Sequence, residues 1–410
     1  MPIPATKTRW GGIADGRFRP AGFFRVGQCD GVCWLIDPDG GRFLSKGVNT
    51  VKFDQDAIQN SDRIPYAEAC GKKYGCEGAW RTAAARRLAS WGFNTLGSWS
   101  DEAVAAAAPV PLAVTHNIDL GMSFAWQTND RAGSGPKQDF PDVFDPAFET
   151  HVLHRAREHC AARSGEQGLI GWFIDNEVRW GPDWRGPDEL LLQFLNLPPA
   201  TPGRIAATEW LRQRHGGSDP PHAAFAADCE AFAALAADRY FALTIAAIKA
   251  TDPNHLVLGC RFAFPPPAAV IDAAGRHLDV ISFNCYGPDA NGALDAYAIT
   301  GKPCLIGEFS FRGADSGLPN SNGAGPVVAT QAERAAAFRH YVSTALQRRT
   351  LVGYHWFEHA DQPAEGRFDG ENSNFGTVTI NDDVYEDLTR AMTALNAEAE
   401  DLHAAADTTS

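Results

Sequence analysis

The stretch that decides the fold is Leu169-Ile-Gly-Trp-Phe-Ile-Asp-Asn-Glu177. Its first six residues are apolar or glycine, and its last three are polar. A short, continuous apolar run is typical of a strand that is buried on both faces of a parallel sheet. The polar residues at the carboxyl end of this run predict that the chemistry of the protein lies where its strands end.

Seven other short apolar runs lie outward from this stretch in both directions. They span residues 44–50, 93–98, 112–118, 255–260, 280–284, 304–307 and 351–357. Most are separated by stretches that favour helices, at 77–90, 101–107, 148–160, 205–214, 222–251, 330–348 and 385–398. This alternation predicts a parallel sheet with helical crossovers, and eight such units predict a (β/α)8 TIM barrel.

The barrel accounts for most of the chain, which suggests a simple domain organisation. We expect residues 1–45 to form an N-terminal extension whose β-hairpin, at 23–43, caps the barrel. The turn of this hairpin is Asp37-Pro-Asp-Gly-Gly41. We expect residues 46–400 to form the catalytic barrel and residues 401–410, rich in Ala and Thr, to form a flexible tail.

The composition excludes several classes of partner. The formal net charge is −14, and hydrophobic residues make up 44% of the chain. Binding to nucleic acid or to an anionic membrane surface needs clustered Lys and Arg. The most apolar stretch, 103–114, is interrupted by Pro109 and Pro111 and is shorter than the roughly 20 residues of a membrane span. We therefore expect neither partner, and the sequence leaves the oligomeric state open.

The N-terminus and the cysteines bear on the compartment. The first ten residues contain no apolar segment of the kind found in a signal peptide, which predicts a cytoplasmic protein. The nine cysteines are scattered, and Cys260, Cys285 and Cys304 lie in or beside apolar runs, where Cys behaves as a small hydrophobe. The pairs 29/33 and 70/76 can form disulfides or bind metal, although neither has the spacing of a zinc site. Reduced thiols are the simpler interpretation.

Two glutamates stand at the ends of predicted strands. Glu177 closes the stretch quoted above, and Glu308 closes Pro303-Cys-Leu-Ile-Gly-Glu308. A carboxylate at the end of a buried strand is costly unless it is paired or used. Either glutamate alone can be explained by a helix cap or an Arg partner, but both together face each other across the barrel mouth. A glycosidase needs this pair, because one carboxyl group protonates the leaving oxygen and the other attacks the anomeric carbon.

Other polar and aromatic residues near the strand ends suit a sugar. Asn176 can hydrogen-bond to a hydroxyl beside the reacting carbon, and Tyr286 can contact Glu308. Trp356, at the end of the eighth strand, can form an apolar floor for a pyranose ring. Four further tryptophans in strand-end loops fit either stacking on sugars or core packing: Trp99, Trp126, Trp180 and Trp184.

The Asn-Glu pair after the fourth strand and the Glu after the seventh resemble the signature of clan A glycoside hydrolases. Four stretches are more specifically similar to the β-agarase family, glycoside hydrolase family fifty. They are 91–100 (WGFNTLGSWS), 171–181 (GWFIDNEVRWG), 307–313 (GEFSFRG) and 353–363 (GYHWFEHADQP), the last of which continues through 366–376. The resemblance covers roughly residues 25–395.

This resemblance implies a retaining β-glycoside hydrolase, with Glu177 as acid/base and Glu308 as nucleophile, and it implies no cofactor or metal. Its sugar contacts would be Asn176, Tyr286 and Trp356, and its further pocket residues would be Asn49, Trp99, His116, Arg367 and Glu371. The chain departs from the family at Ser310, where the family has His, and we expect neither a signal nor the additional N-terminal domain of the family. We therefore expect a small β-linked oligosaccharide, with a β-galactosidic bond, as substrate.

Three alternatives stay open. The first is the same mechanism acting on another small β-glycoside, and the second is a non-catalytic barrel that binds sugar. The third is a zinc hydrolase, because His355-Trp-Phe-Glu-His359 matches the H-x-x-E-H pattern. That pattern requires a helix, and on a strand the two histidines would be about 13 Å apart. The Gly-rich segment 313–325 lacks the Lys-Ser/Thr ending of a phosphate loop, and we expect it to shape a subsite above Glu308.

Overall fold

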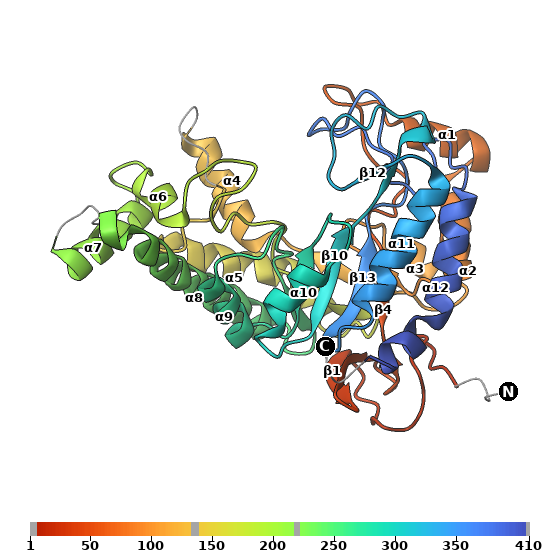
Figure 1. Ribbon diagram of the computed structural model, residues 1–410, viewed down its shortest axis with the longest axis horizontal. Coiled ribbons are helices and arrows are strands. Elements are labelled where there is room, and N and C mark those ends of the chain that lie inside the picture. Colours follow the sequence, from red (N-terminus) through yellow and green to blue (C-terminus); the bar gives the residue numbers. More distant parts are fainter. Residues whose placement is uncertain (1–5, 133–138, 217–221, 407–410) are drawn as a thin grey trace.

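The computed structural model describes residues 6–132, 139–216 and 222–406. Eight parallel strands form one sheet in the order β8-β7-β6-β5-β4-β13-β10-β9. Helices surround this sheet (Figure 1), so the predicted (β/α)8 barrel is confirmed. The strands are β4 (Ser45–Val48), β5 (Thr95–Leu96), β6 (Ala113–Asn117), β7 (Leu169–Phe173), β8 (Leu256–Gly259), β9 (Ile281–Asn284), β10 (Cys304–Phe309) and β13 (Leu351–Trp356).

The barrel is nearly closed between its two outermost strands, β8 and β9. Phe262, just beyond β8, forms an isolated parallel bridge with Phe283 of β9. The backbone N–H of Asn284 donates to the carbonyl of Phe262 at 2.8 Å. This closure brings the carboxyl ends of all eight strands around a single mouth, where barrel enzymes have their active sites.

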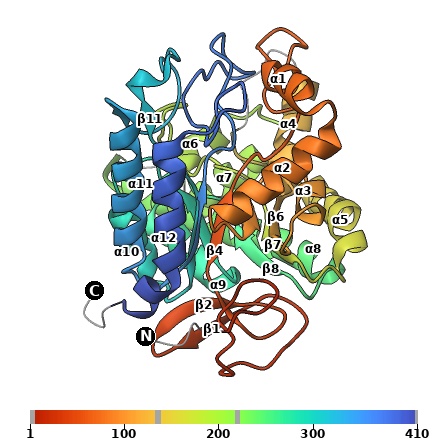
Figure 2. The same cartoon turned by 90° about the vertical axis from the view of Figure 1, so that its right-hand side faces the viewer.

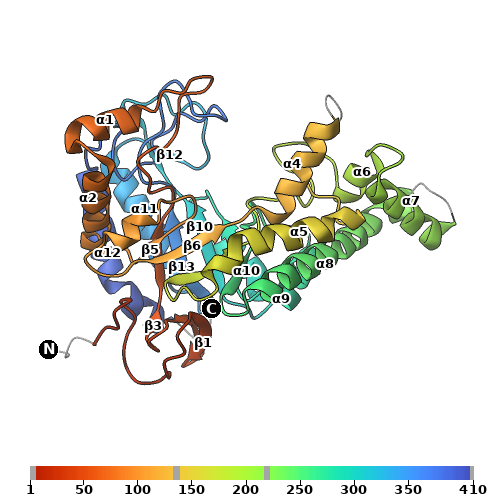
Figure 3. The same cartoon turned by 180° about the vertical axis from the view of Figure 1, so that it is seen from behind.

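The outer layer contains the predicted helices and several that the sequence analysis did not predict. The predicted ones are α2 (Glu77–Ser90), α3 (Ala103–Ala106), α5 (Pro146–Cys160), α7 (Pro202–His215), α8 (Phe225–Thr251), α11 (Gln331–Ala345) and α12 (Glu386–Ala404). The others are α1 (Pro65–Tyr74), α4 (Leu120–Ala132), α6 (Leu190–Leu195), α9 (Ala268–His277) and α10 (Asn291–Ala298). Helices α6 and α7 extend away from the barrel on one side (Figure 3).

Helix α8 corrects the expectation that no segment is long and apolar enough to cross a membrane. By length and composition alone it passes that test, unlike the shorter stretch at 103–114. In the fold, half of its most apolar window is buried, and it packs against α5 and α9 in the outer layer. The core helix of a barrel has the same composition, because it buries an apolar face against the sheet.

The N-terminal residues form a small antiparallel sheet of β1 (Arg25–Cys29), β2 (Val32–Ile36) and β3 (Arg42–Phe43). The predicted turn at 37–41 joins β2 to β3, and the Asp37 carboxylate accepts hydrogen bonds from the backbone of Asp39 and Gly41. The sheet lies below the barrel, opposite the strand-end loops (Figure 2). Its apolar side chains share a core cluster with barrel residues: Trp10, Phe24 and Phe43 with Ile170, Leu305 and Val352.

The prediction of a flexible tail at 401–410 is wrong for its first residues, because α12 continues to Ala404. His403 is buried, and its two ring nitrogens each lie 3.0 Å from a backbone carbonyl, of Leu346 and of Cys33. These contacts anchor the last turn of the helix between the barrel and the N-terminal sheet. Residues 407–410 lie outside the described part of the chain.

Candidate active site

A cavity of about 1070 Å³ opens at the carboxyl ends of the barrel strands. This volume is at the upper end of the range of small-molecule sites, about 300–1,000 Å³, and fits an oligosaccharide. Its lining includes seven of the residues that the sequence singled out: Trp99, Asn176, Glu177, Tyr286, Glu308, Arg367 and Glu371. The expected Gly-rich loop also contributes, through Asn322, Gly323, Ala324 and Gly325.

Glu177 lies four residues beyond the end of β7, against a single hydrogen-bond donor. Its Oε1 accepts from Asn284 Nδ2 at 2.8 Å. Burial, followed by the negative charge of Glu308, raises the pKa of Glu177 to about 7. A carboxyl group with such a pKa is protonated over much of the neutral range and can act as a general acid.

Asp175, two residues earlier, has a structural role. Its carboxylate accepts from the backbone N–H groups of Gly121 and Met122 at 2.9 Å and from Tyr240 Oη at 2.5 Å. Gly121 and Met122 are the second and third residues of α4, so Asp175 satisfies donors at the start of that helix. It therefore does not compete with Glu177 for the role of acid.

Glu308 lies within β10 and is held at both carboxylate oxygens. Tyr286 Oη donates to its Oε2 at 2.6 Å, which is the contact that the sequence predicted. Arg261 Nη2 donates to its Oε1 at 2.6 Å. Hydrogen bonds of this length, one of them charge-assisted, fix the orientation of the carboxylate. Glu177 and Glu308 therefore line one cavity in opposite environments.

Arg261 is a functional residue that the sequence analysis missed. It follows β8, and its side chain is fully buried. The guanidinium donates to Glu308, to Asn176 Oδ1 at 2.8 Å and to Ser98 Oγ at 2.9 Å. It also lies over the rings of Trp99 and Phe173, at 4.9 and 4.7 Å from their centroids. An Arg directly after a strand was the available signal, because polar residues at that end of a barrel strand face the mouth.

Several cavity residues adopt a backbone conformation that side chains disfavour. Residues at or just beyond the ends of five barrel strands have positive φ angles: Thr50 at 56°, Trp99 at 61°, Asp119 at 48°, Glu177 at 52° and Arg261 at 50°. A left-handed residue other than glycine costs on the order of 1–3 kcal/mol and persists only where the surroundings impose it. Such strain clusters at functional sites, which strengthens the assignment of this mouth as the active site.

Three predicted pocket residues lie outside the cavity lining. Trp356 is fully buried and donates from Nε1 to the carbonyl of Phe375 at 2.9 Å. Asn49 is also buried, and its Nδ2 donates to the carbonyl of Gly307 at 2.9 Å, joining β4 to β10. His116 pairs with Glu102 at 2.7 Å. Its ring stacks on Trp172, with 5.6 Å between the centroids.

Phe357 takes the place that the sequence gave to Trp356. It is the next residue along the chain, and it lines the cavity. Successive side chains of a strand point to opposite faces, so an error of one residue moves the aromatic ring from the cavity into the outer layer. Trp99 stands edge-on to Phe357, with 6.5 Å between the ring centroids, and is 39% exposed. Together these two rings supply an apolar surface near the glutamates.

Two more aromatic residues form part of the rim. Trp184 and Phe264 are 62% and 61% exposed, line the cavity, and meet edge to face with 5.8 Å between their centroids. The guanidinium of Arg185 lies over the Trp184 ring. Trp180 is buried in the core, and Trp126, although exposed, does not line the cavity.

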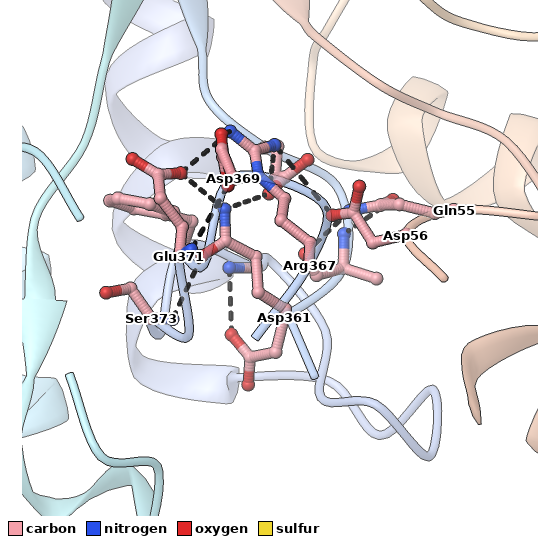
Figure 4. Close-up of polar contacts among 12 residues, drawn as sticks. Gln55, Asp56, Asp361, Arg367, Asp369, Glu371 and Ser373 are labelled. Atoms are coloured by element: carbon pink, nitrogen blue, oxygen red, sulfur yellow. Dashed lines mark hydrogen bonds and ion pairs between the residues drawn. The ribbon is translucent and has the colours of Figure 1, made fainter. Parts of the chain in front are cut away.

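Arg367 and Glu371 belong to a network of charged side chains on another wall of the cavity (Figure 4). Arg367 Nη2 lies 2.8 Å from Glu371 Oε2 and 3.0 Å from Asp369 Oδ2. Gln362 Nε2 donates to Glu371 at 2.9 Å and to the buried Glu358 at 3.1 Å. The sequence predicted the first two residues as part of the pocket, and the structure adds their partners.

The two histidines of the zinc-like pattern lie in different surroundings. His355 lies in β13, with Nε2 2.9 Å from Ser45 Oγ. The His359 ring lies near the rings of Tyr66 and Trp80, at centroid distances of 6.2 and 6.1 Å. Burial lowers the pKa of each imidazole to about 3. The segment is therefore not the helix that an H-x-x-E-H zinc site requires.

Comparison with known proteins finds β-agarases among the relatives of this chain. No family model matches it. β-Agarase A from Vibrio sp. (strain JT0107) is 31% identical over 466 aligned positions, which cover 92% of this chain and 46% of the relative. β-Agarase B from the same strain is 26% identical over 483 positions, covering 95% and 49%. The chain is similar to β-agarases in sequence and in fold.

The β-agarase-like chain spans about half the length of these curated relatives. Among solved structures, an exo-β-agarase superposes with a TM-score of 0.83 at 23% identity, covering 98% of this chain and 68% of that one. BpGH50 superposes with a TM-score of 0.81 at 25% identity, covering 98% and 87%. The resemblance that the sequence motifs suggested is therefore confirmed.

Proposed function

We propose that this protein hydrolyses a β-galactosidic bond in a small agar-type oligosaccharide with retention of configuration. Glu177 is the acid/base and Glu308 is the nucleophile. One observation carries this proposal: the two glutamates line the same cavity, but one is buried against a single amide donor and the other is held by Tyr286 and Arg261. Two carboxyl groups whose environments differ in this way are suited to opposite roles.

The first step follows from these environments. Glu177, protonated at neutral pH, donates its proton to the glycosidic oxygen as the bond to the leaving sugar breaks. Glu308 attacks the anomeric carbon with a carboxylate oxygen, and a covalent glycosyl-enzyme forms. Asn176, fixed by Arg261, is placed beside Glu177 to hydrogen-bond to a hydroxyl of the reacting sugar.

The second step reverses the roles. Glu177, now a carboxylate, takes a proton from a water molecule, and the oxygen of that water attacks the anomeric carbon. The bond to Glu308 breaks, so the nucleophile leaves as a carboxylate and Glu177 is again protonated. Two inversions at the same carbon give a product with the starting β configuration.

The substrate class rests on the relatives and on the cavity. The two curated relatives are named β-agarases, and one superposed structure is named an exo-β-agarase. The aromatic rings of Trp99, Phe357, Trp184 and Phe264 suit the C–H faces of pyranose rings. A cavity of about 1070 Å³ favours a short oligosaccharide over a longer polymer segment.

The decisive experiment is a product analysis with neoagaro-oligosaccharides and a panel of other small β-glycosides. We expect wild-type protein to release the β-anomer first, as followed by NMR, and Glu308→Gln to lose at least about 1,000-fold in kcat. Glu149→Gln, on the exposed first turn of α5, is the matched control and should keep full activity. A Glu308→Gln variant as fast as wild type would overturn the assignment. Tight binding without hydrolysis over days would favour the sugar-binding alternative.

We also propose a cytoplasmic location. All nine cysteines are free thiols, including the pairs 29/33 and 70/76 that the sequence left open. Free thiols persist where the compartment is reducing. Fractionation of the producing cells, with thiol labelling of the recovered protein, tests this directly. Recovery mainly outside the cytoplasm would contradict it.

A further inference from the structure

The charged wall of the cavity around Arg367 has a chemistry of its own. Four carboxylates lie within 4.0 Å of the guanidinium. Figure 4 labels three of these residues, Asp56, Asp369 and Glu371, around Arg367. Nη2 lies 2.8 Å from Glu371 and 3.0 Å from Asp369, and Nη1 lies 3.9 Å from both Asp56 and Glu358. We call these five residues the Arg367 wall. Its single cation forms short ion pairs with Glu371 and Asp369, so its charge is already balanced by the protein before an anionic ligand arrives.

The buried part of the Arg367 wall contains carboxylate oxygens that accept no hydrogen bond from the described residues. Glu358 is fully buried, and its Oε2 has no hydrogen-bond partner among the described residues. Asp56 Oδ2 is also buried and has no hydrogen-bond partner among the described residues. Burial raises the pKa of both carboxyl groups, and the negative charge of Asp56 raises that of Glu358 further. The charge of Arg367 opposes both shifts. An anion that displaced Glu371 or Asp369 from Arg367 would add one more uncompensated charge.

The rest of the lining adds no free positive charge. Five carboxyl groups line the cavity: Asp56, Glu177, Glu308, Asp369 and Glu371. Glu177 is the protonated acid of the proposed mechanism, and Glu308 is paired with Arg261. Among the described residues, the lining cations are Arg367 and Lys52. Lys52 opposes the rise in the pKa of Asp56, which places its ammonium group close to that carboxylate. Both cations are therefore balanced by the protein's own acids before any substrate enters.

We infer that the Arg367 wall selects uncharged sugar residues beside Glu308 and excludes those that carry a sulfate ester or a carboxylate. This inference rests on the proposed function. A neutral sugar offers hydroxyl groups, which can donate to the free lone pairs of Glu371 and Asp369, whose side chains are 19% and 37% exposed. An anionic substituent offers only acceptors and meets like charges. The wall thus favours one substrate class and rejects the other.

The test compares three oligosaccharides that differ at one position of the galactose before the scissile bond: unmodified, 6-O-methylated and 6-O-sulfated. The methyl ether controls for bulk without adding charge. We expect the sulfated compound to have a kcat/KM at least about 100-fold below that of the methylated one. Raising the salt concentration from 0.05 to 0.5 M should narrow this gap several-fold, because salt screens charge at the open cavity.

Two variants test whether the selectivity comes from the Arg367 wall. Glu371→Gln and Asp369→Asn should each reduce the ratio of kcat/KM for the methylated substrate to kcat/KM for the sulfated one by about tenfold. This ratio is the gap between the two substrates. Glu149→Gln removes the same charge from the outer surface and should leave the gap unchanged. The gap is a ratio measured on one preparation, so partial misfolding of a variant does not move it. Equal rates for sulfated and methylated substrates, or equal effects of all three variants, would overturn the inference.

A binding measurement separates this inference from the proposed function. Calorimetry with Glu308→Gln measures the affinities for the same three compounds without turnover, and so reports whether neutral compounds bind more tightly than the sulfated one. If the wild-type protein hydrolyses none of the three compounds and Glu308→Gln still binds the two neutral ones more tightly, the wall is supported and the proposed function is overturned. Hydrolysis with equal binding and rates for all three would do the reverse.

Discussion

At the scale of single residues, hydrogen-bond partners give two glutamates different chemistry. Glu308 receives two short hydrogen bonds from Tyr286 and Arg261, whereas Glu177 receives one from Asn284. Each donor to a carboxylate favours its ionised form, and burial favours the neutral form. In the proposed mechanism, the number of hydrogen-bond donors therefore separates the role of Glu308 from that of Glu177.

The first prediction concerns the pH dependence. Because the pKa of Glu177 is about 7, kcat/KM should fall tenfold per pH unit above that value as the acid loses its proton. The hydrogen bond from Asn284 lowers the pKa of Glu177, so Asn284→Ala should raise it and move the alkaline limb to higher pH. Asn254→Ala, exposed and remote, is the control for the pH–rate profiles. A shift to lower pH would contradict the assignment.

Arg261 provides the second prediction. Lysine cannot reproduce a guanidinium that donates to Glu308, Asn176 and Ser98 at once, so Arg261→Lys should lower kcat by about 100-fold with a smaller change in KM. Arg261→Lys keeps the positive charge, so the alkaline limb of the pH–rate profile should stay in place. The positive charge of Arg261 lowers the pKa of Glu177. Arg261→Met removes this charge, so the pKa of Glu177 should rise and the alkaline limb should move to higher pH. Identical profiles for both variants would indicate a merely structural role.

The sequence predicted the site residues whose role depends on strand ends and missed those whose role depends on side-chain direction. Glu177, Glu308 and Tyr286 follow directly from the ends of apolar runs. Trp356 was off by one residue, since a short run does not reveal which face of a strand points inward. Arg261 was missed because its partners come from strands that are distant in sequence.

At the scale of elements, the aromatic rim lies on strand-end loops, whereas Glu308 lies in β10 and Glu177 lies four residues beyond β7. The loop after β7 brings Trp184 to the rim, where it meets Phe264 from the loop after β8. Loops of a rigid barrel can change without disturbing its core. Differences in substrate length should therefore be determined by these aromatic residues.

The third prediction tests this division. Trp184→Ala should raise KM for oligosaccharides about tenfold, which is about 1.4 kcal/mol, and leave kcat for a short aryl β-galactoside unchanged. Trp126→Ala removes a comparably exposed ring, 49% against 62%, from outside the cavity and should change neither. Steady-state kinetics on both substrates decides the matter. Equal effects of the two variants would mean that Trp184 does not bind sugar.

Elements were predicted from the sequence to different degrees. The eight strands were found because buried apolar runs are continuous, and α2 was predicted at its observed bounds. Helices α4 and α9 were missed because Gly, Pro and Ser at or near their starts resemble loops. Tertiary contacts stabilise them: the first turn of α4 donates backbone hydrogen bonds to Asp175, and α9 packs against α8.

At the scale of the whole molecule, the two ends of the barrel have separate tasks. The cavity occupies the carboxyl ends of the strands, and the N-terminal sheet covers the opposite end (Figure 2). Phe24 is 1% exposed there and packs edge-on against Trp10 and Phe43. Stability should therefore be sensitive to this end and chemistry to the other.

The fourth prediction follows. Phe24→Ala should cost about 3–5 kcal/mol in the free energy of unfolding, because it removes a buried ring and leaves a cavity. Below the melting temperature, kcat and KM should equal those of wild type. Ile299→Ala, 72% exposed, serves as control with a change within about 0.5 kcal/mol. Thermal denaturation with parallel kinetics measures both, and a loss of activity in folded Phe24→Ala would show that the two ends are coupled.

Arg261 has a consequence for how this barrel can acquire new substrates. One guanidinium connects residues that follow β5 and β7 with residues of β10, and it is itself carried by the segment after β8. A substitution there would have to be compensated at several distant sites at once, which single mutational steps do not supply. In a selection for new specificity, variation should accumulate in the aromatic rim and the Arg367 wall, while this position stays unchanged in every surviving lineage.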